Sequence, residues 1–211
     1  MKDNGLLVQY FNANTPADQT LWAKAVKDAA TLKKLGATAV WFPPATKGAA
    51  GKDDRGYAPY DLYDLGEFNQ KGSVGTRYGT KKEYLEAIDA MKAQGINVYA
   101  DIAVRQKLGA DSVEKVTAAD FNAKDIPQMI GNKKIVGALS KFTFPGRKSK
   151  YSKFKWNWNH FAGIDWQQDD FKRRVCELSG MTEMEAEKKY KLSKYDYIIG
   201  SELDLYNQEV Y

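Results

Sequence analysis

The sequence predicts an α/β protein in which strands and helices alternate along the first half of the chain. Apolar runs at 6–11, 38–42 and 96–104 have the length and composition of strands buried on both faces. Between them, 21–35 and 82–94 carry apolar residues at helical spacing, and a glycine follows each. Because strands that alternate with helices form parallel sheets, we expect three parallel strands connected by two helices.

The connections between these elements differ in length. Two prolines end the second strand, because proline cannot donate to a strand ladder. The following segment, 45–79, is rich in Gly, Lys, Asp and Tyr and is too long for a simple connector, so we expect it to carry function or to form a lid. After residue 104 the sequence breaks into shorter, aromatic-rich pieces, which predict a mostly β insertion with a helix at about 182–190 and a strand at 195–199.

The composition is that of a folded chain stabilised by packing. The 211 residues are 43% hydrophobic and 13% aromatic, which excludes disorder and fibrous repeats. The only cysteine, Cys176, can neither close an internal disulfide nor build a cysteine zinc site. The only histidine, His160, supports neither a zinc cage nor a hydrolase triad, and we interpret it as a structural residue.

A formal charge of +5 raises nucleic-acid binding as an alternative. The densest basic stretch, 141–155, has aromatic residues between its lysines, and such rings can stack on bases. Alternating rings such as Phe142 and Phe144 also describe strands with one buried face and solvated lysines. We favour the second interpretation and expect no nucleic-acid partner.

The lengths of the apolar runs and the first residues of the sequence bear on membrane association and secretion. No stretch reaches the roughly eighteen apolar residues that a spanning helix needs, so we expect no membrane partner. The first residues lack the pattern of a signal peptide. The sequence as it stands therefore predicts a cytoplasmic protein, or a secreted one if a leader has been removed.

The long loop and several shorter segments together resemble one enzyme family. The two longest matches are GYAPYDLYDLGEF at 56–68 and KGSVGTRYGT at 71–80. Shorter matches are VQYF at 8–11, VWFPP at 40–44, NVYAD at 97–101, FPGR at 144–147, YSKFKW at 151–156 and YDY at 195–197. In this order they closely resemble the α-amylases of the liquefying bacterial type, and the resemblance covers nearly the whole chain.

The resemblance implies a (β/α)8 barrel of the TIM type whose third strand is followed by an inserted, mostly β domain B. This chain would supply the first three β/α units, at 1–104, then a domain B-like region at 105–200 and a return segment toward the barrel at 201–211. The barrel would be incomplete within this chain.

The implied activity is retaining hydrolysis of starch and related α-1,4-glucans, which needs two carboxyl groups about 5 Å apart. In the family, the catalytic carboxylates follow strands four, five and seven, which this chain does not include. We therefore expect no catalytic residues here, no activity from the chain alone, and association with a complementing polypeptide or with a second copy. The alternatives are a catalytically dead α-glucan-binding or scaffold protein, or a truncated gene product.

The resemblance also implies contacts with an α-glucan or maltooligosaccharide. A substrate ring stacks on a loop tyrosine in the family, and Tyr57 matches it. Tyrosine suits this task because its flat face covers the apolar CH surface of a sugar while its hydroxyl stays hydrated. Gln106 stands where the family has a substrate-binding histidine, and Tyr10 and Trp41 are further candidate contacts.

The family's calcium site is expected to be weakened or lost, so no cofactor is predicted. Where the family has an asparagine ligand this chain has Arg105, and a guanidinium has only donors and a positive charge. The remaining candidate ligands are Asp165, Asp196, Glu202 and Asp204.

Asp101 and Arg105 are expected to have structural roles. In the family, the aspartate at the Asp101 position pairs with an arginine on strand four, which this chain does not include. An unpaired buried carboxylate is costly, and Arg105 is our first candidate for its partner. Arg105 has Asp196 or Glu202 as alternative partners.

Overall fold

The computed structural model describes residues 5–121, 129–166, 168–169, 175–178, 200–204 and 207–210, with the side chains of 121, 129–131, 175–177 and 202 left out. The helix expected at 182–190 and the strand expected at 195–199 lie outside these residues. The chain forms two compact units, Met1–Val104 with Pro145–Ser152 and Arg105–Phe144 with Lys153–Tyr211. Within the described part, neither helix is long and apolar enough to cross a membrane.

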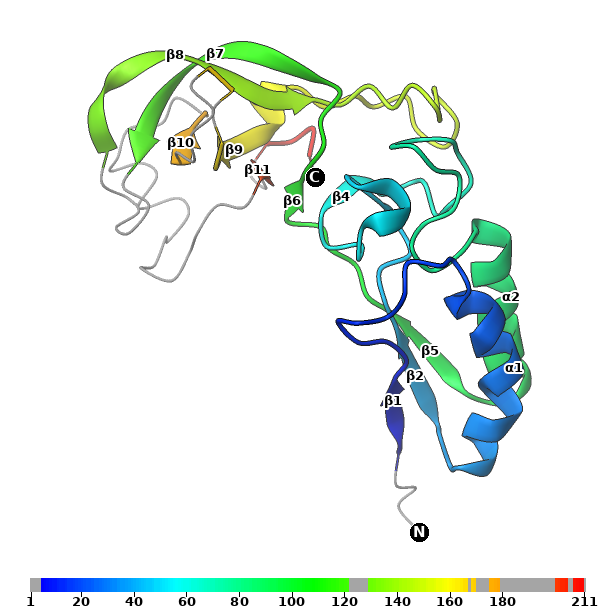
Figure 1. The fold of residues 1–211 in the computed structure, drawn as a ribbon. Coiled ribbons are helices and arrows are strands. Elements are labelled where there is room, and N and C mark those ends of the chain that lie inside the picture. The colour runs from blue at the N-terminus through cyan, green and yellow to red at the C-terminus, as the bar shows by residue number, and fades with distance from the viewer. Residues whose placement is uncertain are drawn as a thin grey trace. The chain divides into compact units, whose positions relative to one another are not determined.

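The first unit contains a parallel sheet covered on one face by two helices (Figure 1). Strands β1 (Leu7–Gln9), β2 (Ala39–Phe42) and β5 (Asn97–Ala100) pair in the order β1-β2-β5. Helix α1 (Leu21–Lys34) connects β1 to β2, and helix α2 (Lys81–Ala93) precedes β5. The three predicted strands and both predicted helices are confirmed, with ends that differ by a few residues.

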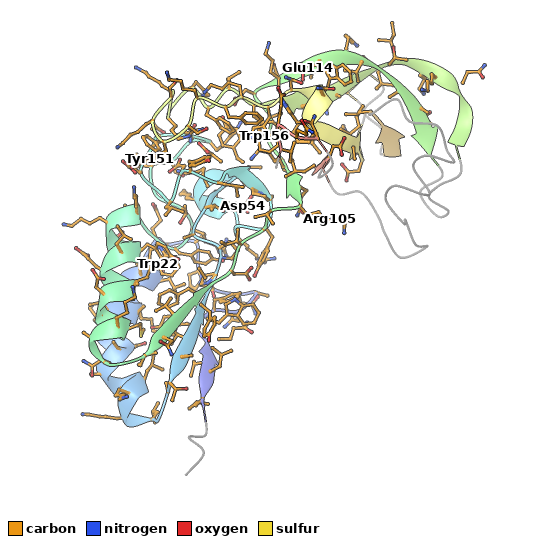
Figure 2. The ribbon with its side chains drawn as sticks, turned by 180° about the vertical axis from the view of Figure 1, so that it is seen from behind. Trp22, Asp54, Arg105, Glu114, Tyr151 and Trp156 are labelled. Carbon is orange, nitrogen blue, oxygen red and sulfur yellow. The ribbon has the colours of Figure 1, made fainter. Side chains whose placement is uncertain are left out.

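The core of this unit lies between the helices and the sheet. Trp22 of α1 is fully buried, and its ring centroid lies 5.2 Å from that of Phe42 and 4.8 Å from that of Tyr84 (Figure 2). Because side chains alternate along a strand, Val40 and Phe42 both face the helices, and both are fully buried. The helical spacing that predicted α1 therefore also marked its buried face, whereas the buried face of β2 follows from alternation along the strand.

The opposite face of the sheet is open in the part of the chain that the structure describes. Leu7 in β1 and Tyr99 in β5 are 55% and 59% exposed. The expectation that the strands are buried on both faces is therefore wrong for β1 and β5. The apolar side chains on this face of β1 and β5 form a surface that the described residues of the first unit leave exposed.

The long loop is ordered by short elements rather than by regular periodicity. Strands β3 (Lys47–Gly48) and β4 (Pro59–Asp61) pair antiparallel, and a 3₁₀ turn, η1 (Gly51–Asp53), lies between them. Residues 49–58 therefore connect the two strands of a small hairpin. Backbone bonding continues beyond the ladder, because the amide of Ala49 donates to the carbonyl of Ala58 over 2.8 Å.

The second unit is built on a six-stranded sheet, ordered β6-β11-β9-β10-β7-β8. Its elements are β6 (Gln106–Lys107), β7 (Ser112–Phe121), β8 (Met129–Lys141), η2 (Trp158–His160), β9 (Phe161–Ile164), β10 (Val175–Glu177) and β11 (Ser201–Leu203). The prediction of a mostly β segment agrees with this sheet. The prediction of only short pieces is wrong for β7 and β8, which form a long antiparallel pair.

The expected strands around Phe142 and Trp156 are also smaller than predicted. The two residues form an isolated antiparallel bridge, with amide-to-carbonyl distances of 3.0 and 3.1 Å. Their rings pack within the second unit, where Phe142 is fully buried. The alternation of rings therefore marked a buried face correctly but not an extended ladder.

Candidate functional site

Tyr57, in the long loop, and Asp101, which follows β5, form the centre of the candidate site. The Tyr57 hydroxyl donates to Asp101 Oδ2 over 2.7 Å, while 44% of the tyrosine remains exposed. Burial, followed by this hydrogen bond, raises the pKa of Tyr57, so the hydroxyl stays protonated and acts as the donor. The result is an exposed aromatic ring whose polar end is fixed.

Arg105 was our first candidate for the partner of Asp101, but the partner that the structure shows is Tyr57. Arg105 belongs to the second unit, where its carbonyl accepts from the amide of Leu203 over 3.0 Å. No local sequence pattern marks Tyr57 as the partner, because 44 positions separate it from Asp101.

The structure does not bring Tyr10 and Trp41 to one face of the sheet. Tyr10 points toward the helices, where its hydroxyl donates to Asp28 Oδ2 over 2.6 Å and its ring lies 5.9 Å from Phe42. Burial, together with Asp28, raises the pKa of Tyr10. Trp41 lies at the alternate position, on the open face, with its ring edge-on to Phe11 at 5.4 Å. Trp41 thus fits a ligand contact better than Tyr10 does.

Gln106 lies in the second unit, on β6. It is paired in register with Glu202 on β11, and it is partly exposed. Gln106 and Tyr57 therefore belong to different compact units of the chain.

Only two of the four candidate calcium ligands, Asp165 and Asp204, have side chains among the described residues. Asp165 donates its amide to Gly200, and Asp204 is 8% exposed with its amide bonded to the carbonyl of His160. Asp196 lies outside the described residues, and the side chain of Glu202 is not among them. Within the described set, no group of three or more acidic, histidine or cysteine side chains is placed to hold a metal ion.

His160 is a structural residue, as the sequence indicated. It is 1% exposed, Nδ1 accepts from the amide of Asn157 over 2.9 Å, and Nε2 lies 2.9 Å from Glu209 Oε2. Its ring also packs against Phe154, with 4.9 Å between centroids. Both ring nitrogens are therefore used within the second unit.

Buried charges below the Tyr57 loop were missed by sequence reasoning. The ammonium of Lys47, which is 0% exposed, donates to the carbonyls of Ser73 and Val74 over 2.7 and 2.6 Å and lies 3.7 Å from Asp64 Oδ2. A lysine in a loop is usually a solvated residue, and nothing in its local sequence marks it as buried.

A second buried ion pair closes the same region. Arg147 Nε donates to Asp61 Oδ2 over 2.7 Å, and both side chains are 1% exposed. Gln70 connects the two carboxylates by donating to Asp61 Oδ2 and Asp64 Oδ2 over 3.0 and 2.9 Å. Ion pairs of this kind fix the loop because each charge is costly to bury without its partner.

Comparisons with known proteins agree with the motifs of the loop. No protein-family model matches the chain. The chain is 46% identical over 208 residues to the α-amylase of Geobacillus stearothermophilus, a match that covers 98% of this chain and 38% of that enzyme. It is 41% identical to the glucan 1,4-α-maltohexaosidase of Bacillus sp. (strain 707), with coverage of 98% and 40%.

The chain belongs to the α-amylase family. It spans about two fifths of the length of the curated relatives it matches. A further relative of this α-amylase-family chain is the cytoplasmic α-amylase of Escherichia coli (strain K12), 36% identical, with 98% of this chain and 42% of that enzyme covered.

Solved structures show an amylase-type α/β fold. A truncated alternansucrase from Leuconostoc mesenteroides matches with a TM-score of 0.57 at 24% identity, covering 70% of this chain and 14% of that protein. An alternansucrase in complex with isomaltotriose matches with the same TM-score, identity and coverage. At this identity the likeness concerns the fold of the α-amylase-family chain alone.

Proposed function

We propose that this chain forms the N-terminal part of an α-amylase-type glycoside hydrolase that acts on α-1,4-glucans. It provides the first three β/α units of a (β/α)8 barrel together with an inserted, mostly β domain B. The observation that carries the proposal is the match to α-amylases over 98% of the chain, at up to 46% identity. The parallel β1-β2-β5 sheet, with helices on one face, supports the barrel assignment.

In this proposal the ring of Tyr57 receives a glucose unit. The ring is partly exposed, and its hydroxyl is fixed by Asp101, so its face is available to the CH groups of a sugar. Trp41, on the open face of the same unit, is a second aromatic contact. An alternansucrase of similar fold is known in complex with isomaltotriose, an oligosaccharide of glucose, which supports a glucan as the ligand class.

Hydrolysis requires carboxylates from outside this chain. A retaining glycosidase needs a nucleophile and an acid/base about 5 Å apart. The family's catalytic positions do not lie on the three strands of this sheet, so they must come from a complementing polypeptide or from further sequence. The chain alone is therefore inactive.

A second candidate is a catalytically dead glucan-binding or scaffold protein. It is favoured by the pair Arg105 and Gln106, which replace the family's calcium-binding asparagine and substrate-binding histidine. In either case calcium contributes little, because an arginine cannot be its ligand.

Complementation distinguishes these candidates. The chain is co-expressed with the part of the Geobacillus stearothermophilus α-amylase that lies outside the match, and maltoheptaose binding and reducing-sugar release are measured. We expect no release from either part alone and release from the complex, at a level that falls with Tyr57→Ala. Binding without release would support the scaffold candidate, and neither binding nor release would refute the proposed function.

A further inference from the structure

We propose that two carboxylates, Asp54 and Asp101, hold Tyr57 as a preset stacking platform, and that both are positioning residues for the ligand. The inference deepens the proposed function and rests on it for the identity of the ligand. The clamp itself is a property of the chain and is testable without any glucan.

Asp54 holds the backbone on both sides of Tyr57. Its Oδ1 accepts from the amides of Gly56 and Ala58 over 2.7 and 3.5 Å, and its Oδ2 accepts from the amide of Ala50 over 3.3 Å. The carboxylate thus connects the two ends of the loop segment between Ala50 and Ala58. Such side-chain acceptors replace the ladder hydrogen bonds that an irregular loop lacks.

Two glycines allow this close packing. A Cβ on Gly48 would lie 2.1 Å from Asp54 Cγ, so the carboxylate rests directly on the backbone of β3. Gly56 has φ +91°, and a Cβ there would lie 2.6 Å from the Cβ and the carbonyl oxygen of Pro44. The residue before Tyr57 is therefore pressed against the end of β2 in a conformation that favours glycine.

Asp101 fixes the other end of the tyrosine. Its amide donates to the carbonyl of Phe42 over 3.0 Å, which extends the β2–β5 pairing by one residue. The carboxylate that accepts from the Tyr57 hydroxyl is thereby attached to the sheet. A ring held at its backbone and at its hydroxyl loses little freedom on binding, so more of the stacking energy appears as affinity.

An alternative role for Tyr57 is packing within the loop. The exposed fraction of Tyr57, 44%, argues against it, because packing requires coverage of the ring. One carboxylate, Asp101, holds the side chain of Tyr57, and the other, Asp54, holds the backbone beside it, although the ring between them is half-exposed. The arrangement instead fits a surface that is kept ready for a flat, partly apolar ligand such as a pyranose.

Titration of the tyrosine tests the clamp without a ligand. The phenol of Tyr57 is followed by NMR with ¹³Cζ-labelled tyrosine, assigned from Tyr57→Phe. We expect its pKa to lie above the ordinary value of 10.0 and to fall in Asp101→Leu. Asp54→Ala should broaden or shift the ring signals, whereas Asp53→Ala, which alters the neighbouring exposed carboxylate, should not. An unchanged pKa in Asp101→Leu would overturn the clamp.

Glucan binding tests the positioning role in the complemented protein. Affinity for maltoheptaose is measured for Tyr57→Phe, Asp101→Leu and the double variant, with circular dichroism as the check of folding. We expect Tyr57→Phe to bind about tenfold more weakly and Asp101→Leu at least as weakly, because Asp101→Leu also removes the family's pairing with the arginine on strand four. The double variant should bind no more weakly than Asp101→Leu, since both changes remove the same Tyr57–Asp101 hydrogen bond. Tyr63→Phe, at another exposed tyrosine, serves as the control.

The outcomes separate the two proposals. Wild-type affinity in Tyr57→Phe and Asp101→Leu, with loss only in Tyr57→Ala, would overturn the positioning role and leave the stacking function intact. A raised pKa of Tyr57 that falls in Asp101→Leu, in a complemented protein that binds no maltoheptaose, would refute the proposed function and support the clamp.

Discussion

Lys47 is fully buried, and its ammonium has more acceptors than protons. Four carbonyl oxygens, those of Phe68, Ser73, Val74 and Gly75, lie within 3.4 Å of Nζ, and Asp64 balances the charge. Burial lowers the pKa of Lys47, and the Asp64 carboxylate acts in the opposite direction. The side chain thus occupies the place of a bound cation at the centre of the loop.

Replacing this lysine should destabilise the first unit strongly. Lys47→Met keeps the apolar stem but leaves four carbonyls and a carboxylate buried without their cation, which costs about 3–5 kcal/mol of unfolding free energy. Urea unfolding followed by tryptophan fluorescence, to which the buried Trp22 of this unit contributes, measures the loss. Lys52→Met, at an exposed pair with Asp53, should change the free energy by under about 1 kcal/mol. Equal effects of the two substitutions would contradict the cation role.

Arg105 also predicts how the chain responds to calcium. The wild-type chain should show little change in melting temperature between EGTA and millimolar calcium, because an arginine stands where the family has its asparagine ligand and a guanidinium cannot ligate calcium. Arg105→Asn returns an oxygen ligand to the family position and should create or strengthen a calcium-dependent rise. A substantial rise in the wild type that Arg105→Asn does not increase would show that the arginine does not decide metal binding.

At the scale of elements, residues 145–152 act as a strap that is bound to the first unit. Arg147 pairs with Asp61 and also donates to the carbonyls of Lys150 and Ser152 over 2.6 and 2.8 Å. At the surface, Glu67 accepts from Lys150 and from the Tyr151 hydroxyl. The strap thus combines one buried ion pair with one exposed cluster.

The exposed cluster predicts a titration. Lys150, then Lys81 and Tyr151, lower the pKa of Glu67 from 4.5 to about 2. A carboxyl whose folded pKa is lowered stabilises the protein above its unfolded pKa, and this stabilisation is lost as the pH falls through about 2. NMR titration of the Glu67 side-chain carbon should show this midpoint, and Lys150→Met should raise it. Lys148→Met, at an exposed neighbour, should not, and a midpoint near 4.5 in the wild type would refute the cluster.

The sequence predicted the elements whose apolar residues stand out locally. Helices α1 and α2 repeat apolar residues at helical spacing, strands β1, β2 and β5 are short apolar runs, and each was found. In β7, Val116 and Ala118 are buried while Lys115 and Thr117 are exposed, so an alternating pattern was present there too. Its charged and small residues concealed it, because alternation between polar groups and alanine gives a weak hydrophobic signal.

The candidate site could be predicted only in part, because one of its contacts joins residues that are far apart in the sequence. Tyr57 was recognised by its motif, but its partners Asp54 and Asp101 depend on tertiary contacts. The Asp-x-Gly pattern at 54–56 was a local signal that could have been read, because aspartate often caps such turns. The bond to Asp101, like the Arg147–Asp61 pair, joins residues far apart in sequence and had no local signal.

At the scale of the molecule, the chain passes between its two units three times, after residues 104, 144 and 152. Within the first unit, the described residues leave one sheet face uncovered and leave β1 and β5 as edge strands. Exposed backbone donors and acceptors at such edges favour pairing with another chain. The exposed apolar side chains nearby, among them Leu7, Tyr99 and Ile102, act in the same direction.

We therefore expect the purified chain to self-associate at micromolar concentration through this face, burying over about 1,000 Å². Sedimentation velocity should show Leu7→Lys and Tyr99→Lys as monomers, because each places a charge where apolar surface is covered. Leu85→Lys, at a 46% exposed position on α2, adds the same charge on the helical layer and should not change the association. Since a complementing polypeptide would use the same edges, its addition should replace the self-associated form by a mixed complex. A wild-type monomer, or dissociation by Leu85→Lys alone, would show that this face is not the site of association.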